Sequence, residues 1–390
     1  MQNNDNVIFP PAKIGVIGGG QLGRMLAFET KKMGYELITL DPKLNCPTAQ
    51  VCDKQIVGSL YDQDKIRELA NQCDVLTYEF EFLDTDVLCQ LESEGYKIFP
   101  SGRTLKKIQN KYIQKSLFKD ANLPVPKFIK INNRLELNNA IEELGLPAVL
   151  KCCTGGYDGK GNFVIKTLED AQELDIESML DNVELMLEEF IPFRCEISMG
   201  VARNMSGEVA YYPLGENEHY ESILKYTKVP ANVGVDIEEK AINVVGKIMD
   251  VFNDVGMFCV ELFVTDNNEI YINEVAPRPH NSTHYTIEAC KTSQFEQQLR
   301  AITGLPLGST DLISPVVMAN LLGEEDIDGK FKVTGLENLL VEKGVHFHYY
   351  GKESVGVKRK IGHITVLDEN TEKAETRAKK SLENINIISI

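Results

Sequence analysis

One hairpin constrains the fold of this chain more than any other segment. It spans residues 259–278, CVELFVTDNNEIYINEVAPR, in which two apolar, β-branched runs flank Asn267 and Asn268. Asparagine tolerates the left-handed backbone that a tight hairpin turn demands, so these two residues are the expected loop. With that loop, Asp266 faces Glu269, and the pairing of every residue further along follows by counting outward. The segment therefore predicts an antiparallel strand pair of defined register.

The same count places Glu261 directly opposite Glu274. Directly opposed Cβ atoms lie roughly 5 Å apart on one face of a sheet. Both strands are largely apolar, so we expect the pair to be buried, and two buried carboxylates that close repel each other. A shared proton would relieve the repulsion, and so would a hard cation, because oxygen ligands suit Mg²⁺ that also holds substrate phosphates. The two glutamates are therefore candidate metal ligands, unless the true register differs.

Composition and charge restrict the class of protein. A chain of 390 residues, 43% hydrophobic and 25% charged, is long enough for two or three globular domains. No apolar run approaches the ~20 residues of a membrane span, and the first residues lack the pattern of a secretory signal. The net charge of −17 argues against nucleic acid or an anionic membrane as the main partner, and leaves small anionic substrates at a local basic site. Nine cysteines without a CxxC pair are typical of the reducing cytosol, so a cytoplasmic location is expected.

The N-terminal third alternates short apolar strands with helical patterns. A strand over Lys13–Ile17 leads into a glycine turn and a helix over Arg24–Met33. Further elements are expected as strands at Glu36–Leu40, at a segment ending in Thr77-Tyr78-Glu79 and at Tyr96–Phe99, and as helices at about 62–71, 85–94 and Lys106–Ala121. Such βαβ alternation indicates a doubly wound parallel sheet.

The pattern changes after about residue 127. Strands are expected at 148–152, 162–166, 185–190, 195–203 and 208–214, and helices at 236–255 and 293–303, with short strands and turns after about 320. The chain is thus expected to combine α/β and α+β architecture in three parts. These are an N-terminal Rossmann-like domain at 1–110, a central domain at 111–315 with a flap subdomain at about 125–190, and a C-terminal β-rich domain at 316–390.

The first glycine turn, GGGQLG over Gly18–Gly23, follows a strand and opens a helix, with Asp41 at the end of the next strand. This arrangement resembles the dinucleotide-binding fingerprint. A tight turn with free backbone N–H groups at a helix N-terminus is a site for an anion. Three interpretations stay open: NAD or FAD, another phosphate, or plain close packing. Gln21 and Arg24 favour a phosphate or a polar substrate.

The second glycine loop is TGGYDGKG, over Thr154–Gly161. It is not a Walker A motif, because Thr154 and Gly161 stand where that motif needs glycine and serine or threonine. It joins two expected strands, and its four glycines give a mobile flap whose amides can close over phosphates. Lys151, on the preceding strand, is a natural fixed cation for phosphate oxygens. A flexible hairpin tip with a solvated lysine is the alternative, but flap, lysine and opposed glutamates together indicate a nucleotide-phosphate site.

The order of several motifs along the chain resembles one family. GGGQLGRM, KCCTGGYDGKGN, LEEFI, INEVAPRPHNSTHYTIEAC and GKESVGVKRKIGH are similar to segments of the 5-(carboxyamino)imidazole ribonucleotide synthases, which are ATP-grasp ligases of bacterial purine biosynthesis. The resemblance covers about residues 13–367. It implies an N-terminal doubly wound parallel sheet (the pre-ATP-grasp domain), central ATP-grasp domains, a small C-terminal β-rich domain and a homodimer.

The resemblance implies a nucleotide site. Lys111 and Lys151 would bind the phosphates of ATP, and Glu261 and Glu274 would hold one or two Mg²⁺ ions. The other implied ATP-binding residues are Gly155, Gly156, Tyr157, Gly159, Lys160 and Gly161 of the flap, Glu188, Glu189, Phe190 and Ile191 of a hinge that reads adenine, Glu196 at the ribose, His219, and Asn273 beside Glu274.

The resemblance also implies a carboxylation site. Arg278, His280 and Asn281 match residues that bind bicarbonate and carboxyphosphate, and Asp158 joins them as a catalytic residue. The residues implied for the ribonucleotide substrate are Gln21, Leu22, Glu79, Tyr157, Asp158, Lys352 and Arg359, the last two at its 5′-phosphate. The sequence departs from the family pattern at Cys152-Cys153, Asn162 and Thr283, but none of these departures removes a charged group that the chemistry needs.

These features predict an ATP-dependent carbon–nitrogen ligase. The implied reaction carboxylates the 5-amino group of 5-aminoimidazole ribonucleotide with ATP and bicarbonate, through carboxyphosphate. Another ATP-grasp ligase, such as a formate-dependent purine enzyme or a biotin carboxylase, would share the nucleotide site. A nicotinamide oxidoreductase built on the first glycine turn would leave the glutamate pair and the flap unexplained. A non-catalytic ATP-binding module would leave the full set of charged residues without a purpose.

Overall fold

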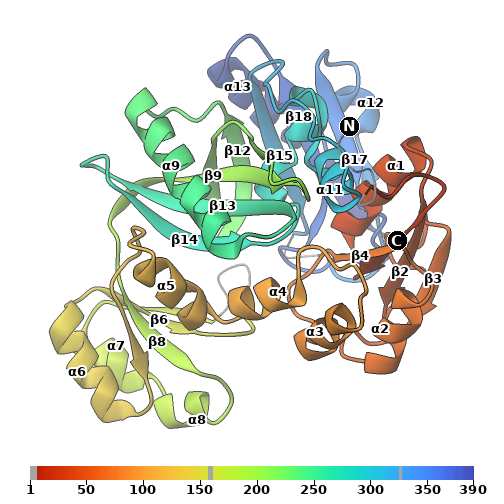
Figure 1. Cartoon of the computed structure of the whole chain (residues 1–390). Helices are drawn as coiled ribbons and strands as arrows, with labels where there is room; N and C mark the ends of the chain where they lie inside the picture. The colour runs from red at the N-terminus through yellow and green to blue at the C-terminus, as the bar shows by residue number, and fades with distance from the viewer. Residues whose placement is uncertain (1–6, 157–160, 325–326) are drawn as a thin grey trace.

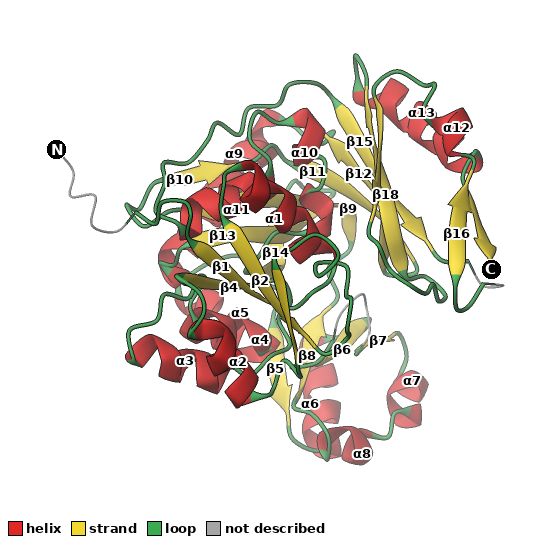
Figure 2. Ribbon diagram, turned by 90° about the vertical axis from the view of Figure 1, so that its right-hand side faces the viewer, coloured by secondary structure: helices red, strands yellow, loops and turns green. Residues whose placement is uncertain are grey.

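The computed structural model describes residues 7–156, 161–324 and 327–390. The described strands form a four-stranded parallel sheet, a four-stranded antiparallel sheet, a nine-stranded antiparallel sheet and a two-stranded sheet. In Figure 1 the parallel sheet lies at the right, the small antiparallel sheet at the lower left and the large sheet above them; Figure 2 shows the same parts after a quarter turn. No helix within the described ranges is both long enough and apolar enough to cross a membrane.

The N-terminal sheet consists of short strands in the order β3-β2-β1-β4, all parallel. Its elements are β1 (Lys13–Ile17), α1 (Gln21–Lys32), β2 (Glu36–Asp41), β3 (Lys54–Val57), α2 (Gln63–Ala70), β4 (Val75–Tyr78) and α3 (Thr85–Ser93). The predicted parallel sheet is confirmed with two corrections. The predicted strand at Tyr96–Phe99 is only an isolated bridge between Leu76 and Ile98. The pattern also missed β3, of which only Ile56 is buried.

Two short helices, α4 (Gly102–Gln109) and α5 (Lys111–Asp120), connect this sheet to the rest of the molecule. The predicted single helix over Lys106–Ala121 is wrong, because Asn110 has an extended backbone (φ −103°, ψ 108°) and its side chain caps α5. The break makes Lys111 the first residue of α5. Its N–H donates to the Cys153 carbonyl at 2.8 Å, which joins α5 to the strand that precedes the flap.

The small antiparallel sheet carries the predicted flap. Its strand order is β5-β8-β6-β7, and short helices pack against it. The bounds are β5 (Phe128–Ile131), α6 (Arg134–Leu144), β6 (Ala148–Cys152), β7 (Asn162–Ile165), α7 (Leu168–Glu173), α8 (Ile176–Leu180) and β8 (Leu185–Glu189). The Cys152 N–H donates to the Gly161 carbonyl at 2.8 Å and closes the base of the β6–β7 loop. Residues 157–160 of this loop lie outside the described residues.

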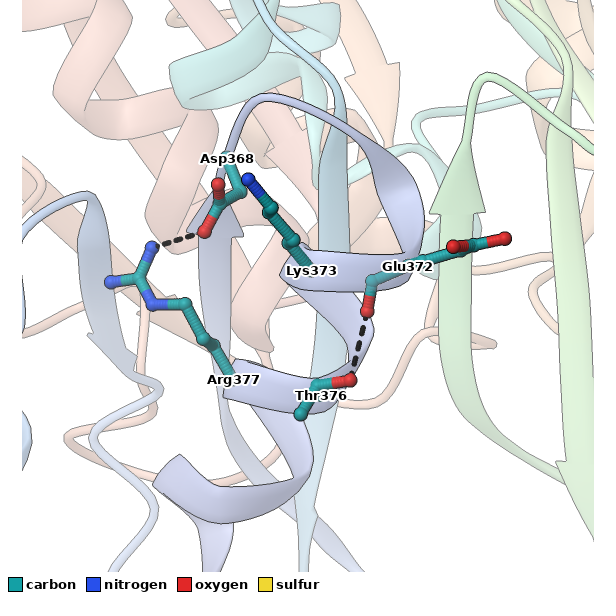
Figure 3. Close-up of a pocket in the computed structure, with 5 residues that line it drawn as sticks. All are labelled: Asp368, Glu372, Lys373, Thr376 and Arg377. Carbon is teal, nitrogen blue, oxygen red and sulfur yellow. Dashed lines mark hydrogen bonds and ion pairs between the residues drawn. The ribbon is translucent and has the colours of Figure 1, made fainter.

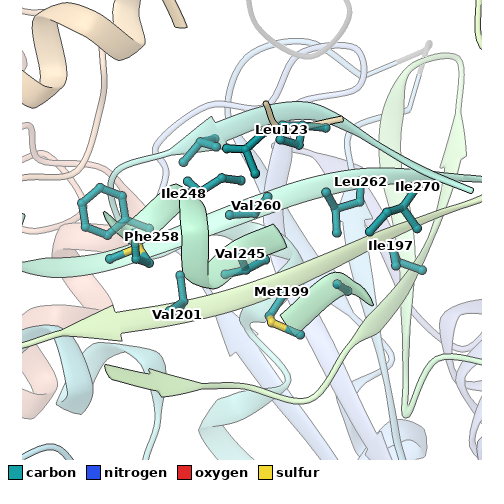
Figure 4. Close-up of a cluster of buried hydrophobic side chains, with 14 of the residues drawn as sticks. Leu123, Ile197, Met199, Val201, Val245, Ile248, Phe258, Val260, Leu262 and Ile270 are labelled. Carbon is teal, nitrogen blue, oxygen red and sulfur yellow. The ribbon is translucent and has the colours of Figure 1, made fainter. Parts of the chain in front are cut away.

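The large sheet packs one face against a long helix, α9 (Figure 4). Its first elements are β9 (Phe193–Arg203), β10 (Val209–Tyr211), β11 (Gly215–Tyr220), β12 (Ile223–Val229), α9 (Val235–Phe252), β13 (Gly256–Thr265) and β14 (Ile270–Ala276). Ile237, Val245 and Ile248 recur at helical spacing and are fully buried. Each such side chain contributes about 1.5–3 kcal/mol on burial. This packing fixes the opposite face of β9, β13 and β14, where the candidate ligands lie.

The same sheet continues into the C-terminal part, because β12 pairs with β15, and β18 and β17 follow. The remaining elements are η2 (Asn281–Thr283), α10 (Thr286–Ala289), α11 (Gln294–Ile302), β15 (Val316–Leu322), β16 (Phe331–Thr334), α12 (Leu336–Leu339), β17 (Val345–Tyr349), β18 (Lys360–Leu367), α13 (Thr371–Glu383) and β19 (Asn386–Ser389). The expectation of only strands and turns here is wrong. α13 buries only Ala374, Ala378 and Ser381, so its sequence shows little apolar periodicity.

Candidate active site

A cleft of about 840 Å³ lies where the three parts of the molecule meet. The N-terminal sheet contributes residues that follow β1 and β4, the flap contributes its first glycines, and the large sheet contributes β14 and the segment after it. The sequence-predicted site residues that line this cleft are Gln21, Leu22, Glu79, Lys111, Gly155, Gly156, Glu274, Arg278, His280, Asn281, Lys352 and Arg359. The fold thus brings candidate nucleotide, carboxylation and ribonucleotide residues together in one cavity.

The loop of the β13–β14 hairpin is one residue longer than predicted. The Thr265 N–H donates to the Glu269 carbonyl at 3.0 Å, so the predicted pairing of Asp266 with Glu269 is wrong. Asn268 takes the left-handed backbone (φ 60°) that the turn needs. A one-residue change in the loop would by itself move every counted pair out of register.

A β-bulge at Asn273 restores the register. Leu262 pairs with Ile272, whereas Glu261 pairs with Glu274, so Asn273 is the extra residue on β14. The longer loop and the bulge cancel, and the predicted facing of Glu261 and Glu274 is confirmed. The nucleotide role predicted for Asn273 falls on the bulge residue and stays a prediction.

The two glutamates differ in exposure. The side chain of Glu261 is 12% exposed and that of Glu274 is 43% exposed, because Glu274 opens into the cleft. The expected burial therefore holds for Glu261 only. Within the described ranges, no set of three or more Asp, Glu, His or Cys side chains is arranged to hold a metal ion by itself. The residues fit a Mg²⁺ ion that takes its remaining ligands from substrate phosphates and water.

Three carboxylates on this sheet influence one another, and two of them, Glu196 and Glu261, lack enough positive charge to balance them. Burial, followed by the charges of Glu196 and Glu274, raises the pKa of Glu261 well above its ordinary value. Burial and then Glu274 raise the pKa of Glu196 to about 8. Although Glu274 is partly exposed, the protein around it removes part of the water from its carboxylate and so opposes its charge; Lys111, at 3.4 Å, and Lys151 outweigh this effect and lower its pKa. A cation held among these carboxylates would remove the repulsion.

Arg278 and His280 follow β14 directly. Arg278 Nη2 lies 2.7 Å from Glu81 Oε1, and although burial disfavours its charge, Glu81 outweighs burial and raises the pKa of Arg278. His280 Nε2 lies 3.7 Å from Glu261 Oε1. Burial, and then the charge of Arg278, lower the pKa of His280 well below its ordinary value, so the ring is neutral at pH 7. A fixed cation beside a neutral imidazole is suited to a small anion.

Asn281 lines the same wall of the cleft, but its amide is already paired. Its Nδ2 donates to Asn320 Oδ1 at 2.9 Å, and Asn320 Nδ2 donates back to Asn281 Oδ1 at 2.7 Å. Asn320 lies on β15 and also donates to the Leu224 carbonyl at 2.9 Å. The amide pair ties the segment after β14 to the C-terminal strands. The catalytic role of Asn281 stays a prediction.

Lys151 is buried beside the cleft and shares its partner with a second lysine. Lys151 Nζ lies 2.7 Å from Glu188 Oε1, and Lys115 Nζ lies 2.7 Å from Glu188 Oε2. Burial opposes the charge of Glu188, but the two lysines outweigh it and lower its pKa. Burial lowers the pKa of Lys115 to about 8. The side chain of Glu188, a predicted hinge residue, therefore bridges two buried lysines.

The other predicted nucleotide residues lie on β8, β9 and β11. His219 Nε2 lies 3.6 Å from Glu196 Oε1, so these two predicted nucleotide residues lie together in the structure. Glu189 is the last residue of β8, and Phe190 and Ile191 lead from it to β9. Their roles at the ribose and adenine stay predictions.

The first glycine turn already holds a carboxylate of the protein itself. The Gly20 N–H donates to one oxygen of Glu79, and the Gly23 N–H donates to the other at 2.6 Å. The Gly19 N–H donates to Asp41 Oδ2 at 2.9 Å. A Cβ at Gly20 would lie 2.7 Å from Glu79 Oε1, so a larger residue there would displace the carboxylate from this position. A dinucleotide phosphate would have to displace Glu79, and a substrate contact by Glu79 would compete with these bonds.

The C-terminal part supplies basic residues to the cleft. Lys352, Lys358, Arg359 and Lys360 all line it, in a chain whose net charge is −17. Arg359 Nη1 donates to the carbonyl and hydroxyl oxygens of Ser354 at 3.2 and 3.1 Å. This cluster is where the sequence predicts a phosphate. The roles predicted for Tyr157, Asp158, Gly159 and Lys160 concern residues outside the described ranges.

Sequence reasoning missed three residues that contact predicted site residues. Glu81 pairs with Arg278, Lys115 with Glu188, and Ser282 Oγ lies 2.9 Å from His280 Nδ1. Signals for two of them were present: Lys115 lies one helical turn after Lys111, and a serine two residues after a histidine suits a capped turn.

A second concavity, of about 350 Å³, lies on α13 (Figure 3). It is lined by Asp368, Glu372, Lys373, Thr376 and Arg377. Arg377 Nη1 lies 2.7 Å from Asp368 Oδ2, and the Thr376 hydroxyl donates to the Glu372 carbonyl at 3.0 Å. Because Arg377 is already paired with Asp368 and the lining shows no arrangement that indicates a ligand, we assign this groove no function.

Comparison with known proteins defines the class to which this fold and site belong. Residues 11–109 match the ribonucleotide synthetase preATP-grasp domain, residues 116–295 the ATP-grasp domain, and residues 316–377 the phosphoribosylaminoimidazole carboxylase C-terminal domain. The predicted fold class, with an N-terminal parallel sheet, a central ATP-grasp domain and a small C-terminal β domain, is confirmed. The protein is an ATP-grasp ligase, an ATP-dependent enzyme that forms a carbon–nitrogen bond.

Relatives narrow this class to one family. The N5-carboxyaminoimidazole ribonucleotide synthase of Bacillus subtilis (strain 168) is 43% identical over 364 residues, 93% of each chain. The N5-carboxyaminoimidazole ribonucleotide synthetase of Thermotoga maritima is 42% identical, with a TM-score of 0.89 over 97% of this chain and 100% of that one. The Aspergillus clavatus synthase in complex with ADP and 5-aminoimidazole ribonucleotide is 34% identical, with a TM-score of 0.86 over 96% and 98%. The chain belongs to the family of N5-carboxyaminoimidazole ribonucleotide synthases.

Proposed function

We propose that this enzyme carboxylates the 5-amino group of 5-aminoimidazole ribonucleotide with ATP and bicarbonate in purine biosynthesis. The products are 5-(carboxyamino)imidazole ribonucleotide, ADP and phosphate. The observation that carries the proposal is one cleft lined by Glu274, Arg278 and His280, with Glu274 paired to Glu261. The relative bound to ADP and 5-aminoimidazole ribonucleotide supports the same substrates.

In the first step, a bicarbonate oxygen attacks the γ-phosphorus of ATP, ADP leaves and carboxyphosphate forms. Lys111 and Lys151 would offset phosphate charge, and Arg278 would hold the bicarbonate in line for attack. Mg²⁺, held by Glu261 and Glu274, would neutralise charge on the phosphates. Such a transfer depends on positioning and electrostatic stabilisation more than on covalent chemistry by the protein.

In the second step, the 5-amino group attacks the carboxyl carbon of carboxyphosphate, phosphate leaves and the nitrogen loses a proton. Arg278 and His280 would retain the intermediate, while Lys352 and Arg359 would hold the ribonucleotide phosphate. Carboxyphosphate is short-lived in water, so closure of the flap over the cleft would exclude solvent.

The test is ADP release from ATP, Mg²⁺ and bicarbonate, with and without 5-aminoimidazole ribonucleotide. We expect release that depends on both bicarbonate and the ribonucleotide, with an acid-labile carboxylated product. Release that another amine stimulates equally well would point to a different ATP-grasp ligase. Nucleotide binding without turnover would point to a non-catalytic module.

We further propose a cytoplasmic homodimer. All nine cysteines are free of disulfide bonds, which is consistent with a reducing compartment. The homodimer follows from the family resemblance, and sedimentation equilibrium tests it.

A further inference from the structure

A chain of buried polar side chains leads away from His280 into the large sheet. Ser282 Oγ lies 2.9 Å from His280 Nδ1, and Ser198 Oγ lies 2.9 Å from Ser282 Oγ. Ser282 and Ser198 are 0% and 1% exposed. Behind them, Asn217 Oδ1 lies 3.4 Å from Ser198 Oγ and accepts from the Thr227 hydroxyl at 3.0 Å. These contacts connect the candidate carboxylation site to the interior of the sheet.

The chain lies on the face of the sheet that carries the candidate metal ligands. Glu274 pairs with Glu261, and Glu261 pairs with Ser198 on β9, so the three residues form one row across three strands. Directly paired residues present their side chains to the same face of a sheet. Ser282, on the short helix η2, contacts the row at Ser198. The row therefore supports His280 at one end and presents Glu274 to the cleft at the other.

Hydrogen-bond polarity fixes the tautomer of His280. The Ser282 backbone N–H donates to His280 Nδ1 at 3.3 Å, and a backbone N–H has no way to accept. Nδ1 is therefore an acceptor, and the single proton of the neutral ring lies on Nε2. The Ser282 hydroxyl, 2.9 Å from the same nitrogen, must then donate to it, while its oxygen accepts from the Ser198 hydroxyl. Nε2 lies 3.7 Å from Glu261 Oε1, and His280 itself lines the cleft beside Arg278.

We propose that Ser282 is a positioning residue, which holds His280 as the Nε2–H tautomer and aims that donor at the anion bound beside Arg278. Ser198 orients the Ser282 hydroxyl. The identity of the anion, bicarbonate or carboxyphosphate, rests on the proposed function; the tautomer does not. A donor fixed in advance stabilises developing negative charge without reorganising at the moment of reaction. With the hydroxyl removed, only the 3.3 Å backbone bond would hold the ring.

The tautomer is tested directly in the unmodified protein. In ¹⁵N-histidine-labelled enzyme, long-range ¹H–¹⁵N correlation spectra distinguish a protonated from an unprotonated ring nitrogen, and the signals missing from His280→Gln assign this ring. We expect an unprotonated Nδ1 and a protonated Nε2. A proton on Nδ1 would overturn the proposal whatever reaction the enzyme catalyses.

The positioning role is tested by kinetics with a matched control. Ser282→Ala is expected to lower kcat for ribonucleotide-dependent ADP release about tenfold, a fraction of the ~100-fold or more that losing a whole anion-binding donor costs. The KM for ATP should stay within about twofold, because Ser282 acts on the carboxylation side. Thr30→Val is the control: it removes another fully buried hydroxyl, which donates to the Ala27 carbonyl at 2.8 Å in a helix of the N-terminal part. Its kcat should not change.

A double-mutant cycle separates action through His280 from a general loss of structure. In a His280→Gln background, Ser282→Ala should cost less than about twofold, because the group it positions is gone. Equal losses in both backgrounds, or a Thr30→Val loss equal to that of Ser282→Ala, would overturn the positioning role. An enzyme without ribonucleotide-dependent ADP release would instead refute the proposed function, while the spectra would still decide the tautomer.

Discussion

Two buried carboxylates in this molecule, Glu188 and Glu261, have opposite electrostatic surroundings. Glu188 lies between Lys115 and Lys151, each 2.7 Å away, and these lysines lower its pKa despite its burial. Glu261 faces other carboxylates, and burial together with their charge raises its pKa well above the ordinary value. The charge of Glu188 is therefore balanced by cations of the protein itself, whereas the charge of Glu261 is not.

The contrast separates a structural carboxylate from a ligand-binding one. A buried charge with internal partners contributes to the fold, and removing either partner leaves an uncompensated charge. A buried acidic group without such partners is retained where an external cation completes the balance. The unbalanced charge at Glu196 and Glu261, beside Glu274, is therefore the physical sign of the active site, and the four predictions below test it.

Glu274→Gln should have the largest effect on activity. Without this carboxylate the metal and the triphosphate lose their shared anchor, and ribonucleotide-dependent ADP release should fall at least about a hundredfold. The variant should fold with at most a modest change in stability, because it removes both the attraction of Lys111 and Lys151 and the repulsion of Glu196 and Glu261. Glu269→Gln, in the loop of the same hairpin, is the matched control and should keep full activity. Near-normal turnover by Glu274→Gln would refute the metal assignment.

Glu188→Gln should have the largest effect on stability. It removes the charged partner of the buried Lys115 and Lys151, and should lower the free energy of unfolding by about 3–5 kcal/mol, measured by urea denaturation. The control is Glu184→Gln: Glu184 pairs with Lys130 at the surface, where its side chain is 48% exposed. Exposed pairs contribute about 0–1 kcal/mol. If the two variants lose equal stability, the contrast between balanced and unbalanced carboxylates fails.

The two sites should also respond oppositely to pH. The folded-state pKa of Glu196 is raised from 4.5 to about 8, so the folded state holds its proton after the unfolded state has lost it. Metal-free protein should therefore lose stability as pH rises from about 4.5 to about 8. The lowered pKa of Glu188 acts in the other direction, and its contribution is lost only in acid below the ordinary value of 4.5. In thermal melts without Mg²⁺, the melting temperature should fall less steeply with rising pH for Glu196→Gln than for the wild type. Identical slopes would argue against the raised pKa of Glu196.

Glu81→Gln should have the smallest effect. Glu81 is a balanced carboxylate within the cleft, paired with Arg278 at 2.7 Å. Its loss should leave the arginine in place but less firmly oriented, raising the KM for bicarbonate roughly threefold with little change in the KM for ATP. A change in the KM for ATP alone would indicate that Arg278 binds ATP and not bicarbonate, which would contradict the role proposed for it.

The fold was predictable where local patterns are strong. β1 and β6 have the predicted bounds, and the pairing of Glu261 with Glu274 follows from the hairpin sequence. That pairing was obtained through two errors that cancel, since neither the longer loop nor the bulge at Asn273 has a clear signal in the residues themselves. α13 and the break at Asn110 were missed, because a polar helix shows little periodicity and a capping asparagine inside a helical pattern resembles an ordinary helix residue.

The sequence predicted which residues belong to the candidate site, but not which residues these side chains contact. Glu79 binds the amides of Gly20 and Gly23, so the turn that resembles a dinucleotide fingerprint is filled by a residue distant in sequence. The bridge of Glu188 to two lysines and the contact of Ser282 with Ser198 also join separate elements. Spacing along the chain can mark a residue such as Lys115 or Ser282 as a candidate, but it does not show which distant residue that side chain contacts.

The central claim is that Glu261 and Glu274 together hold the divalent cation of bound ATP. Electron paramagnetic resonance titration of Mn²⁺ in the presence of a non-hydrolysable ATP analogue tests it most directly. We expect wild-type enzyme with the analogue to bind Mn²⁺ tightly, and the Glu261→Gln/Glu274→Gln variant to bind the analogue while losing the tight Mn²⁺ signal. Unchanged Mn²⁺ affinity in that variant would contradict the account.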